Sequence, residues 1–187
     1  MKKQTTATKR KSVLIVSMLN DQTTNPESPK VIANADKSLE KLQSSLKDKK
    51  VSHDFVVAVD YVGSTNSKWS GNGLVPEKKV IKATLQSDNW FGKENLIAVP
   101  ESEGNGVVHE RFDNIDFLMP PSEYDLTFAG IDFFGSMSNA MKELAKRGYR
   151  IRYYADCSHF YGRNKKEELA EQKIYRHFAN FKPKGDK

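Results

Sequence analysis

The sequence is poor in cysteine and has no long apolar run. Cys157 is the only cysteine among 187 residues, so the chain forms no internal disulfide and no cysteine-based zinc site. This agrees with a reducing compartment, and we expect a cytoplasmic protein with an inert, buried thiol. The longest apolar runs, such as 13–16 and 55–59, fit buried strands and are far shorter than a membrane span. We expect no membrane association.

Recognised nucleic-acid-binding patterns are also missing, since the sequence has no zinc-finger, RNP or helix-turn-helix signature. The formal net charge of +6 is concentrated at the ends of the chain. We predict a disordered basic arm over residues 1–11, without the apolar core of a secretory signal, one folded domain over 12–180, and a basic tail over 181–187. Basic termini bind nucleic acid through counterion release, so nucleic acid is a candidate partner there.

Apolar β-rich runs alternate with segments of helical spacing along the domain. Parallel strands need crossover connections, which are usually helices. The predicted fold is therefore α/β, a three-layer α/β/α sandwich with a mainly parallel sheet. The predicted strands are 12–18, 55–59, 96–100, 107–109, 124–129 and 150–155, and the predicted helices are 29–46, 136–147 and 165–178.

The most informative segment is 128–155, which predicts a strand, a tight turn, a helix and a further strand. Met137, Ala140, Met141 and Leu144 have the spacing of a helix face packed on a sheet, which places Ser136 at the helix start. The first backbone N–H groups of a helix have no internal partners and favour an anion. Ser136 is either a helix cap or a nucleophile that needs a base nearby.

Several segments, in the same order, resemble one known family. Residues 13–22 look like an opening strand that usually ends in Asp-x-Gln-Asn-Asp, and 130–136 look like Gly-Val-x-Thr-Asp-x-Cys. Shorter matches occur at 31–34 and at 58–61, where the family has an acidic residue after its second strand. Residues 107–113 lie where the family has Lys-x-Arg-Tyr-Ser. Residues 147–149 match its Gly-Tyr, and residues 155–157 match its Glu-Asp-Ala. By this order and spacing the chain resembles the isochorismatase-like cysteine hydrolases, which include the nicotinamidases. The resemblance implies a homo-oligomer and a small-molecule pocket.

The family's catalytic triad of Asp, Lys and Cys corresponds to Ser17, His109 and Ser136 in this chain. Glu110 is an alternative to His109 as the counterpart of the lysine. None of the three triad residues is retained. The resemblance also implies an oxyanion site near Ile131 and Asp132, where a carboxylate would repel developing negative charge.

We expect the ligand pocket to include Asp60, Ile131 and Phe133. Asp60 matches the acidic ligand of the nicotinamidase metal site. However, residues 61–72 contain no histidine, so we expect neither a metal nor a cofactor.

Three functions are compatible with these residues. The first is a catalytically degenerate protein that binds a small molecule or a macromolecule. The second is a hydrolase of small amides in which Ser136 attacks, His109 is the base, and Asp132 or Asp113 orients it. The third is a metal-dependent nuclease, since 129–154 has a likeness to NYN/PIN-type nucleases and carboxylates follow several strands, at Asp21, Asp60, Asp132 and Asp156.

Overall fold

The computed structural model describes residues 9–17, 29–48, 51–61, 80–87, 89–100, 107–132, 136–160 and 166. For residues 29–36, 61, 100, 107–108, 131–132, 155–156 and 158–160 it describes the backbone only. The predicted helix 165–178 and the tail 181–187 lie outside the described residues, apart from Lys166.

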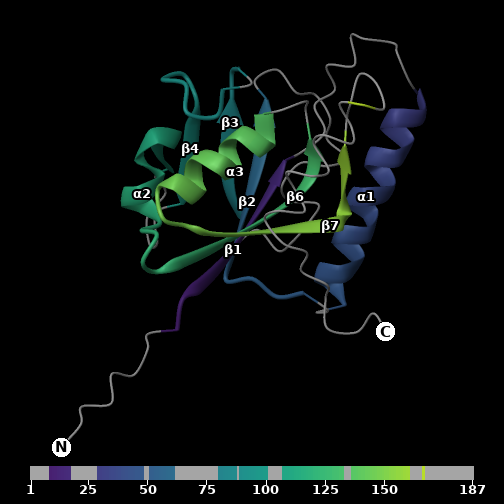
Figure 1. Ribbon diagram of the computed structural model, residues 1–187, viewed down its shortest axis with the longest axis horizontal. Helices are drawn as coiled ribbons and strands as arrows, with labels where there is room; N and C mark the ends of the chain where they lie inside the picture. Colours follow the sequence, from purple (N-terminus) through teal and green to yellow (C-terminus); the bar gives the residue numbers. More distant parts are fainter. Residues whose placement is uncertain are drawn as a thin grey trace, which may run out of the picture.

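The described elements form one seven-stranded sheet with helices on its faces (Figure 1). The strands are β1 (Lys11–Ser17), β2 (Phe55–Tyr61), β3 (Val80–Leu85), β4 (Leu96–Pro100), β5 (Val107–Arg111), β6 (Tyr124–Asp132) and β7 (Arg150–Phe160). The helices are α1 (Pro29–Lys47), α2 (Ile115–Leu118) and α3 (Ser136–Lys146), and a 3₁₀ turn (Phe112–Asn114) precedes α2. In this part of the chain no helix is both long enough and apolar enough to cross a membrane.

The strand order is β5-β4-β3-β2-β1-β6-β7. The strands β3, β2, β1, β6 and β7 are each parallel to the next one in this order, whereas β4 is antiparallel to both β3 and β5. The predicted α/β fold with a mainly parallel sheet is confirmed.

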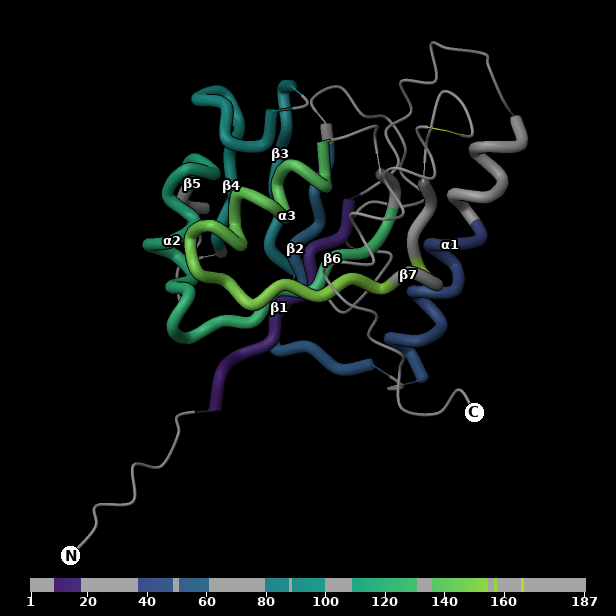
Figure 2. The backbone as a smooth tube through the Cα atoms, in the orientation of Figure 1, coloured from purple at the N-terminus to yellow at the C-terminus, as the bar shows by residue number. Residues whose placement is uncertain are grey.

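The two faces of the sheet bury separate apolar clusters, because successive side chains of a strand point to opposite faces. Val13 and Ile15 belong to the cluster that includes Met137, Met141 and Leu144 of α3. Leu14 and Val16 belong to the cluster that includes Leu39 and Leu42 of α1. We call these the α3 face and the α1 face of the sheet. The backbone path in Figure 2 shows α3 in front of the central strands and α1 beside β7.

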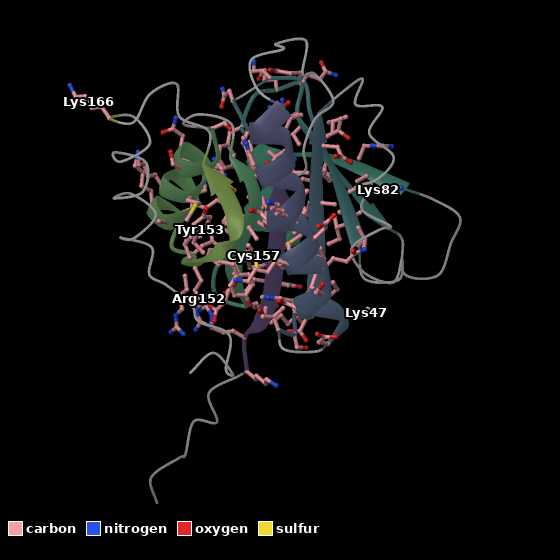
Figure 3. All side chains as sticks on the ribbon, turned by 90° about the vertical axis from the view of Figure 1, so that its right-hand side faces the viewer. Lys47, Lys82, Arg152, Tyr153, Cys157 and Lys166 are labelled. Carbon is pink, nitrogen blue, oxygen red and sulfur yellow. The ribbon has the colours of Figure 1, made fainter. Side chains whose placement is uncertain are left out.

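Cys157 is buried on the α1 face at 3% exposure. Figure 3 shows it on β7, close to α1. The expectation of a buried thiol is therefore confirmed.

Two residues of the predicted basic arm, Arg10 and Lys11, contact the folded body. Lys11 is already part of β1. Arg10 Nε lies 2.5 Å from Asp125 Oδ1, and its two Nη atoms donate to the backbone oxygens of Pro121, Ser122 and Tyr124. Basic composition suggested a solvated residue, but a guanidinium with this many acceptors is held in place.

The strand prediction missed β3 and the reversal of β4. Residues 80–85 mix Lys82 and Thr84 with apolar residues, so they lack a continuous apolar run. The described residues between β3 and β4, 86–87 and 89–95, form no helix. A parallel pair would need a crossover, so this short connection makes the pair antiparallel.

Candidate binding site at the start of α3

The carboxyl ends of β1 and β6 approach each other unusually closely. Ser17 is the register partner of Gly130, and a Cβ on Gly130 would lie 2.2 Å from the carbonyl oxygen of Ser17. Gly130 also has a φ of 102°, which glycine adopts at little cost. Ser17 is buried at 3% exposure and, by alternation with Val13 and Ile15, its side chain is on the α3 face.

α3 begins at Ser136 and runs across this face. Ser136 is 6% exposed, and Met137, Ala140, Met141 and Leu144 form the buried stripe beneath it. The first turn contains no acidic side chain, so the positive end of the helix dipole is not neutralised by its own residues. Ser17 and Ser136 therefore share one face of the sheet.

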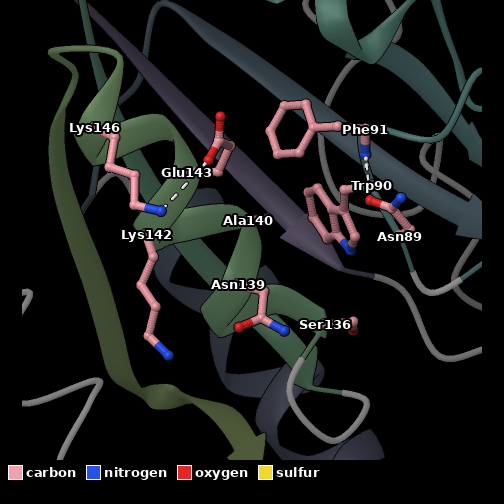
Figure 4. A pocket seen from close by; sticks show the side chains of 9 residues that line it. All are labelled: Asn89, Trp90, Phe91, Ser136, Asn139, Ala140, Lys142, Glu143 and Lys146. Carbon is pink, nitrogen blue, oxygen red and sulfur yellow. Dashed lines mark hydrogen bonds and ion pairs between the residues drawn. The ribbon is translucent and has the colours of Figure 1, made fainter.

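A pocket of about 580 Å³ lies between α3 and the segment that follows β3 (Figure 4). Ser136, Asn139, Ala140 and Glu143 line it from α3, and Asn89, Trp90 and Phe91 line it from the β3–β4 connection. Lys142 and Lys146 complete its wall. This volume is typical of sites for small molecules.

The wall formed by the β3–β4 connection is fixed by Asn95, which is 0% exposed. The Asn95 side chain accepts from the Gln86 N–H at 2.6 Å and donates to the backbone oxygen of Asn89. Its backbone oxygen also accepts from the N–H of Phe112 at 3.2 Å. A loop lacks the backbone hydrogen bonds that pair neighbouring strands, and side-chain hydrogen bonds of this kind take their place. The connection is therefore anchored at both of its ends.

Trp90 is the most deeply buried of the three residues that form this wall. Its ring packs against Phe112 at 5.6 Å and Phe128 at 6.1 Å between centroids, and the residue is only 2% exposed. Its indole Nε1 is buried without any hydrogen-bond partner. An unpaired buried donor costs about 1–3 kcal/mol, which is unusual in so well packed a position.

His109 does not lie beside Ser136. It is on β5, and four strands separate β5 from β6. In the β4–β5 ladder His109 is opposite Ala98, and Glu110 is opposite Ile97. Since Ile97 belongs to the α3-face cluster and cross-strand partners share a face, the exposed His109 side chain is on the α1 face. The predicted pairing of His109 with Ser136 is therefore not formed.

The alternative residues also have other partners. Glu110 is on the α3 face, where its Oε2 accepts from Asn114 Nδ2 at 3.0 Å. Asp113 Oδ1 is 3.3 Å from Arg111 Nε. Glu110 and Asp113 are thus engaged by Asn114 and Arg111.

Asp60 ends up on the face opposite Ser17 and Ser136. It alternates with Val56 and Ala58, which belong to the α1-face cluster. Burial raises the pKa of Asp60 to about 6, and the nearby Lys82 ammonium partly offsets the rise. Of the other predicted pocket residues, Ile131 and Asp132 have described backbone only, in register with His159 and Phe160 of β7, and Phe133 lies outside the described residues.

The residues present do not fit the metal site that the sequence resemblance implies. Asp60 has a lysine ammonium as its charged neighbour, which opposes a cation at the same carboxylate. Residues 61–72 supply no histidine. In the described ranges, no three His, Cys, Asp or Glu side chains lie close enough to hold an ion.

Sequence reasoning missed the β3–β4 wall of the pocket. Asn89, Trp90 and Phe91 follow a strand that was not predicted, and no family motif includes them. Their signal was present in the pattern, since an aromatic pair after the β-rich run 80–85 marks buried surface at a strand end.

No protein-family model matches the sequence, and comparison with curated proteins gives no match. Solved structures do match. The chain has the isochorismatase-like α/β fold, as the resemblance predicted. An isochorismatase-like hydrolase from Alkaliphilus metalliredigens superposes with a TM-score of 0.58 at 9% identity, covering 90% of this chain and 91% of that one.

Two further structures are similar. The MAR1 ribonuclease from Caenorhabditis elegans has a TM-score of 0.53 at 14% identity over 90% of this chain and 73% of its own. The pyrazinamidase of Pyrococcus horikoshii, solved in complex with zinc, has a TM-score of 0.52 at 10% identity over 90% and 96%. At such identities the likeness is one of fold.

Proposed function

We propose that this chain is a catalytically degenerate protein of the isochorismatase-like fold that binds a small molecule in the pocket between α3 and the β3–β4 connection. The placement of Ser136 carries this proposal. By the sequence resemblance Ser136 corresponds to the family's nucleophile, but His109, the base expected from the sequence, is on the other face of the sheet. A serine hydroxyl needs a base within hydrogen-bond reach to attack.

The pocket itself supports binding. Its volume suits a small molecule, and one of its walls is held by the buried Asn95 network. A pre-formed wall reduces the ordering cost of binding. We therefore expect ligand binding to persist where the chemistry has been lost.

The first experiment separates binding from hydrolysis. Ammonia release is measured from nicotinamide and a panel of small amides and ureas, with the wild type, Ser136→Ala and a chelator-treated sample. The proposal expects no release above the Ser136→Ala background. Turnover that is lost only in Ser136→Ala would overturn it in favour of a serine-based amide hydrolase.

Binding is then measured by thermal shift with a small-molecule library. Asn139 is exposed on α3 and lines the pocket, so Asn139→Trp should fill the pocket without disturbing the core. Lys47→Trp, at an exposed end of α1, is the matched control. Stabilising compounds should lose their effect in Asn139→Trp and keep it in Lys47→Trp. Equal shifts in both variants would contradict binding in this pocket.

A second candidate is RNA cleavage, because a similar structure is a MAR1 ribonuclease. The carboxylates at Asp21, Asp60, Asp132 and Asp156 would have to supply the metal ligands, and of these only Asp60 has a described side chain. Degradation of a labelled single-stranded RNA is measured with Mg²⁺ or Mn²⁺ and with chelator. Metal-dependent cleavage that Asp60→Asn abolishes would favour this candidate.

A further inference from the structure

The geometry points to a second reactive site, in which the hydroxyl of Ser12 is a nucleophile, His53 is its base, and an activated ester donates an acyl group to Ser12. The donor class is an aryl ester or a thioester of a carboxylic acid. Ser12 alternates along β1 with Leu14 and Val16, which belong to the α1-face cluster. The site is therefore on the face of the sheet opposite α3, and the inference is independent of the proposed function.

The contact between Ser12 and His53 is the first observation. Ser12 Oγ lies 2.7 Å from His53 Nδ1, which is the reach that a general base needs. Ser12 and His53 are both only partly buried, and the exposed Asp54 follows His53. The pair is thus part of the surface and not of the apolar core, where a reagent could not reach it.

The second observation is the group on the other side of the imidazole ring. His53 Nε2 lies 2.9 Å from Tyr154 Oη, and the two rings meet edge to face at 5.7 Å between centroids. Tyr154 is 4% exposed, so its phenol is held in place. When the Tyr154 oxygen accepts the Nε2 proton, the lone pair of Nδ1 faces the Ser12 hydroxyl. A nucleophile, a base and a third group that orients the base is the arrangement of a catalytic serine.

The backbone around Ser12 is fixed as well. The Asp54 N–H donates to the Ser12 carbonyl oxygen at 2.9 Å, and Asp54 Oδ2 accepts from the Ser12 N–H at 2.8 Å. These two bonds tie the start of β1 to the residue that follows His53. The hydroxyl and the ring are therefore held at reacting distance before any donor arrives, which lowers the entropic cost of the reaction.

The charges around the pair keep His53 available as a base. Burial lowers the pKa of His53 to about 4, the Asp54 carboxylate acts to raise it, and the Arg152 guanidinium acts to lower it. The ring is consequently neutral at pH 7 and able to accept a proton. Arg152 also places a positive charge near the pair, which opposes the charge of Asp54 and favours the negative oxygen that forms on the acyl carbon.

The reaction moves one proton and exchanges one bond. The Ser12 proton goes to His53 Nδ1 while Oγ forms a bond to the acyl carbon. The bond from that carbon to the leaving oxygen or sulfur then breaks, and the leaving group takes the proton from His53. The products are an acylated Ser12, a phenol or thiol, and neutral His53. A base with a low pKa accepts a proton less readily, so we expect slow uptake of one acyl group per chain.

The test treats the full-length protein with p-nitrophenyl acetate at pH 6, where lysine amines are protonated and unreactive. Intact mass spectrometry counts the acetyl groups, and peptide mapping locates them. We expect one acetyl group on Ser12 in the wild type and none in Ser12→Ala. His53→Gln should react at least roughly tenfold more slowly. Ser122→Ala, which changes an exposed serine just before β6, is the matched control and should react as the wild type does.

The pH dependence of the wild type keeps the test decisive if a variant does not fold. His53 is neutral above its pKa of about 4, so acetylation of Ser12 should keep its rate from pH 7 down to about pH 5 and fall below that. An exposed histidine would lose its basic form near pH 6.5. A fall centred near pH 6.5 would therefore overturn the assignment of His53 as the base.

The position of the imidazole proton is a separate readout. ¹⁵N NMR of the ring nitrogens, assigned with His53→Gln, should show the His53 proton on Nε2. Tyr154→Phe removes its acceptor, so we expect a larger share of the proton on Nδ1 and slower acetylation of Ser12. A wild-type proton on Nδ1 would overturn the role of His53, because that nitrogen could not then accept from Ser12.

The labelled residue separates this inference from the proposed function. No acetyl group on Ser12, or equal rates in the wild type and His53→Gln, would overturn the inference and leave the proposed function as it is. Acetylation of Ser136 in place of Ser12 would overturn both, since it would show a reactive serine at the start of α3.

Discussion

Gly130 and Gly148 both have positive φ, at 102° and 93°, but their surroundings differ. Gly148 follows α3, where its N–H donates to Ala145 and the N–H of Tyr149 donates to Leu144. This is the pattern of a glycine-terminated helix. A Cβ on Gly148 would meet nothing closer than Pro121 Cβ at 3.9 Å, whereas one on Gly130 would meet the Ser17 carbonyl oxygen at 2.2 Å.

The two glycines provide a matched test of the β1–β6 junction. Gly148→Ala should cost about 1–2 kcal/mol of unfolding free energy, because only the left-handed backbone is strained. Gly130→Ala adds a steric overlap with β1, so we expect a loss of about 2–5 kcal/mol. Urea unfolding followed by circular dichroism measures both. Equal losses would show that β6 can move away from β1 without cost.

Arg10 tests where the folded body begins. Arg10→Ala removes the ion pair with Asp125 and the bonds to three backbone oxygens, and it should cost about 1–3 kcal/mol. Lys9→Ala, at the neighbouring exposed position, should change the stability by less than about 0.5 kcal/mol. Similar values for the two variants would place Arg10 in the solvated arm after all.

Among the elements that line the pocket, the β3–β4 connection forms one wall and was the harder to predict. Strands with continuous apolar runs, such as β1 and β2, were predicted within two residues of their bounds because burial on both faces leaves an apolar signal. In β3 the exposed Lys82 interrupts the apolar residues, so the apolar pattern that marks a buried strand is weaker there. The direction of β4 depends on the path of the chain, which no local pattern reports.

Asn95 allows the connection to be tested as a unit. Asn95→Ala leaves the Gln86 N–H and the Asn89 oxygen without their side-chain partner, so we expect a loss of about 2 kcal/mol. Asn114→Ala, the same change at an exposed asparagine, should cost less than about 0.5 kcal/mol. Urea unfolding compares them. A small effect of Asn95→Ala would mean that the aromatic contacts alone hold the connection.

The site residues show the same limit of sequence reasoning at the element level. Ser17 ends β1 and Ser136 begins α3, and both elements were predicted. Alternation along β1 places Ser17 on the face that α3 covers. His109 was placed by a motif alone. The face of its strand depends on a register with Ala98 that is set across the sheet, and this register could not be derived from residues 107–113 themselves.

Across the whole molecule, the α1 face carries two half-buried ionisable groups at opposite ends of β2. Asp60 is at the carboxyl end, with its pKa raised to about 6 by burial. His53 precedes the strand, and burial lowers its pKa to about 4. The ring nitrogens of His53 lie 2.7 Å from Ser12 Oγ and 2.9 Å from Tyr154 Oη. Both groups therefore favour their neutral form in the folded state.

These two groups affect stability in opposite directions on acidification. Asp60 has a higher pKa folded than unfolded, so its contribution is fully present below about 3.8 and is lost as the pH rises through 6. His53 has a lower pKa folded than unfolded, so its contribution is present above 6.5 and is lost as the pH falls toward 4. Between pH 4 and 6 the two changes partly cancel in the wild type.

Single variants should separate the two contributions. Asp60→Asn should match the wild type near pH 4 and be more stable by about 1–2 kcal/mol above pH 6, after allowing for solvent screening. His53→Gln should remove the loss that His53 causes between pH 6.5 and 4. Urea unfolding at half-unit pH steps measures both differences. Lys82→Met is the control, since removing this ammonium should raise the pKa of Asp60 further and extend its window upward. A pH-independent difference between Asp60→Asn and the wild type would mean that Asp60 is ionised in the folded protein as freely as in the unfolded chain.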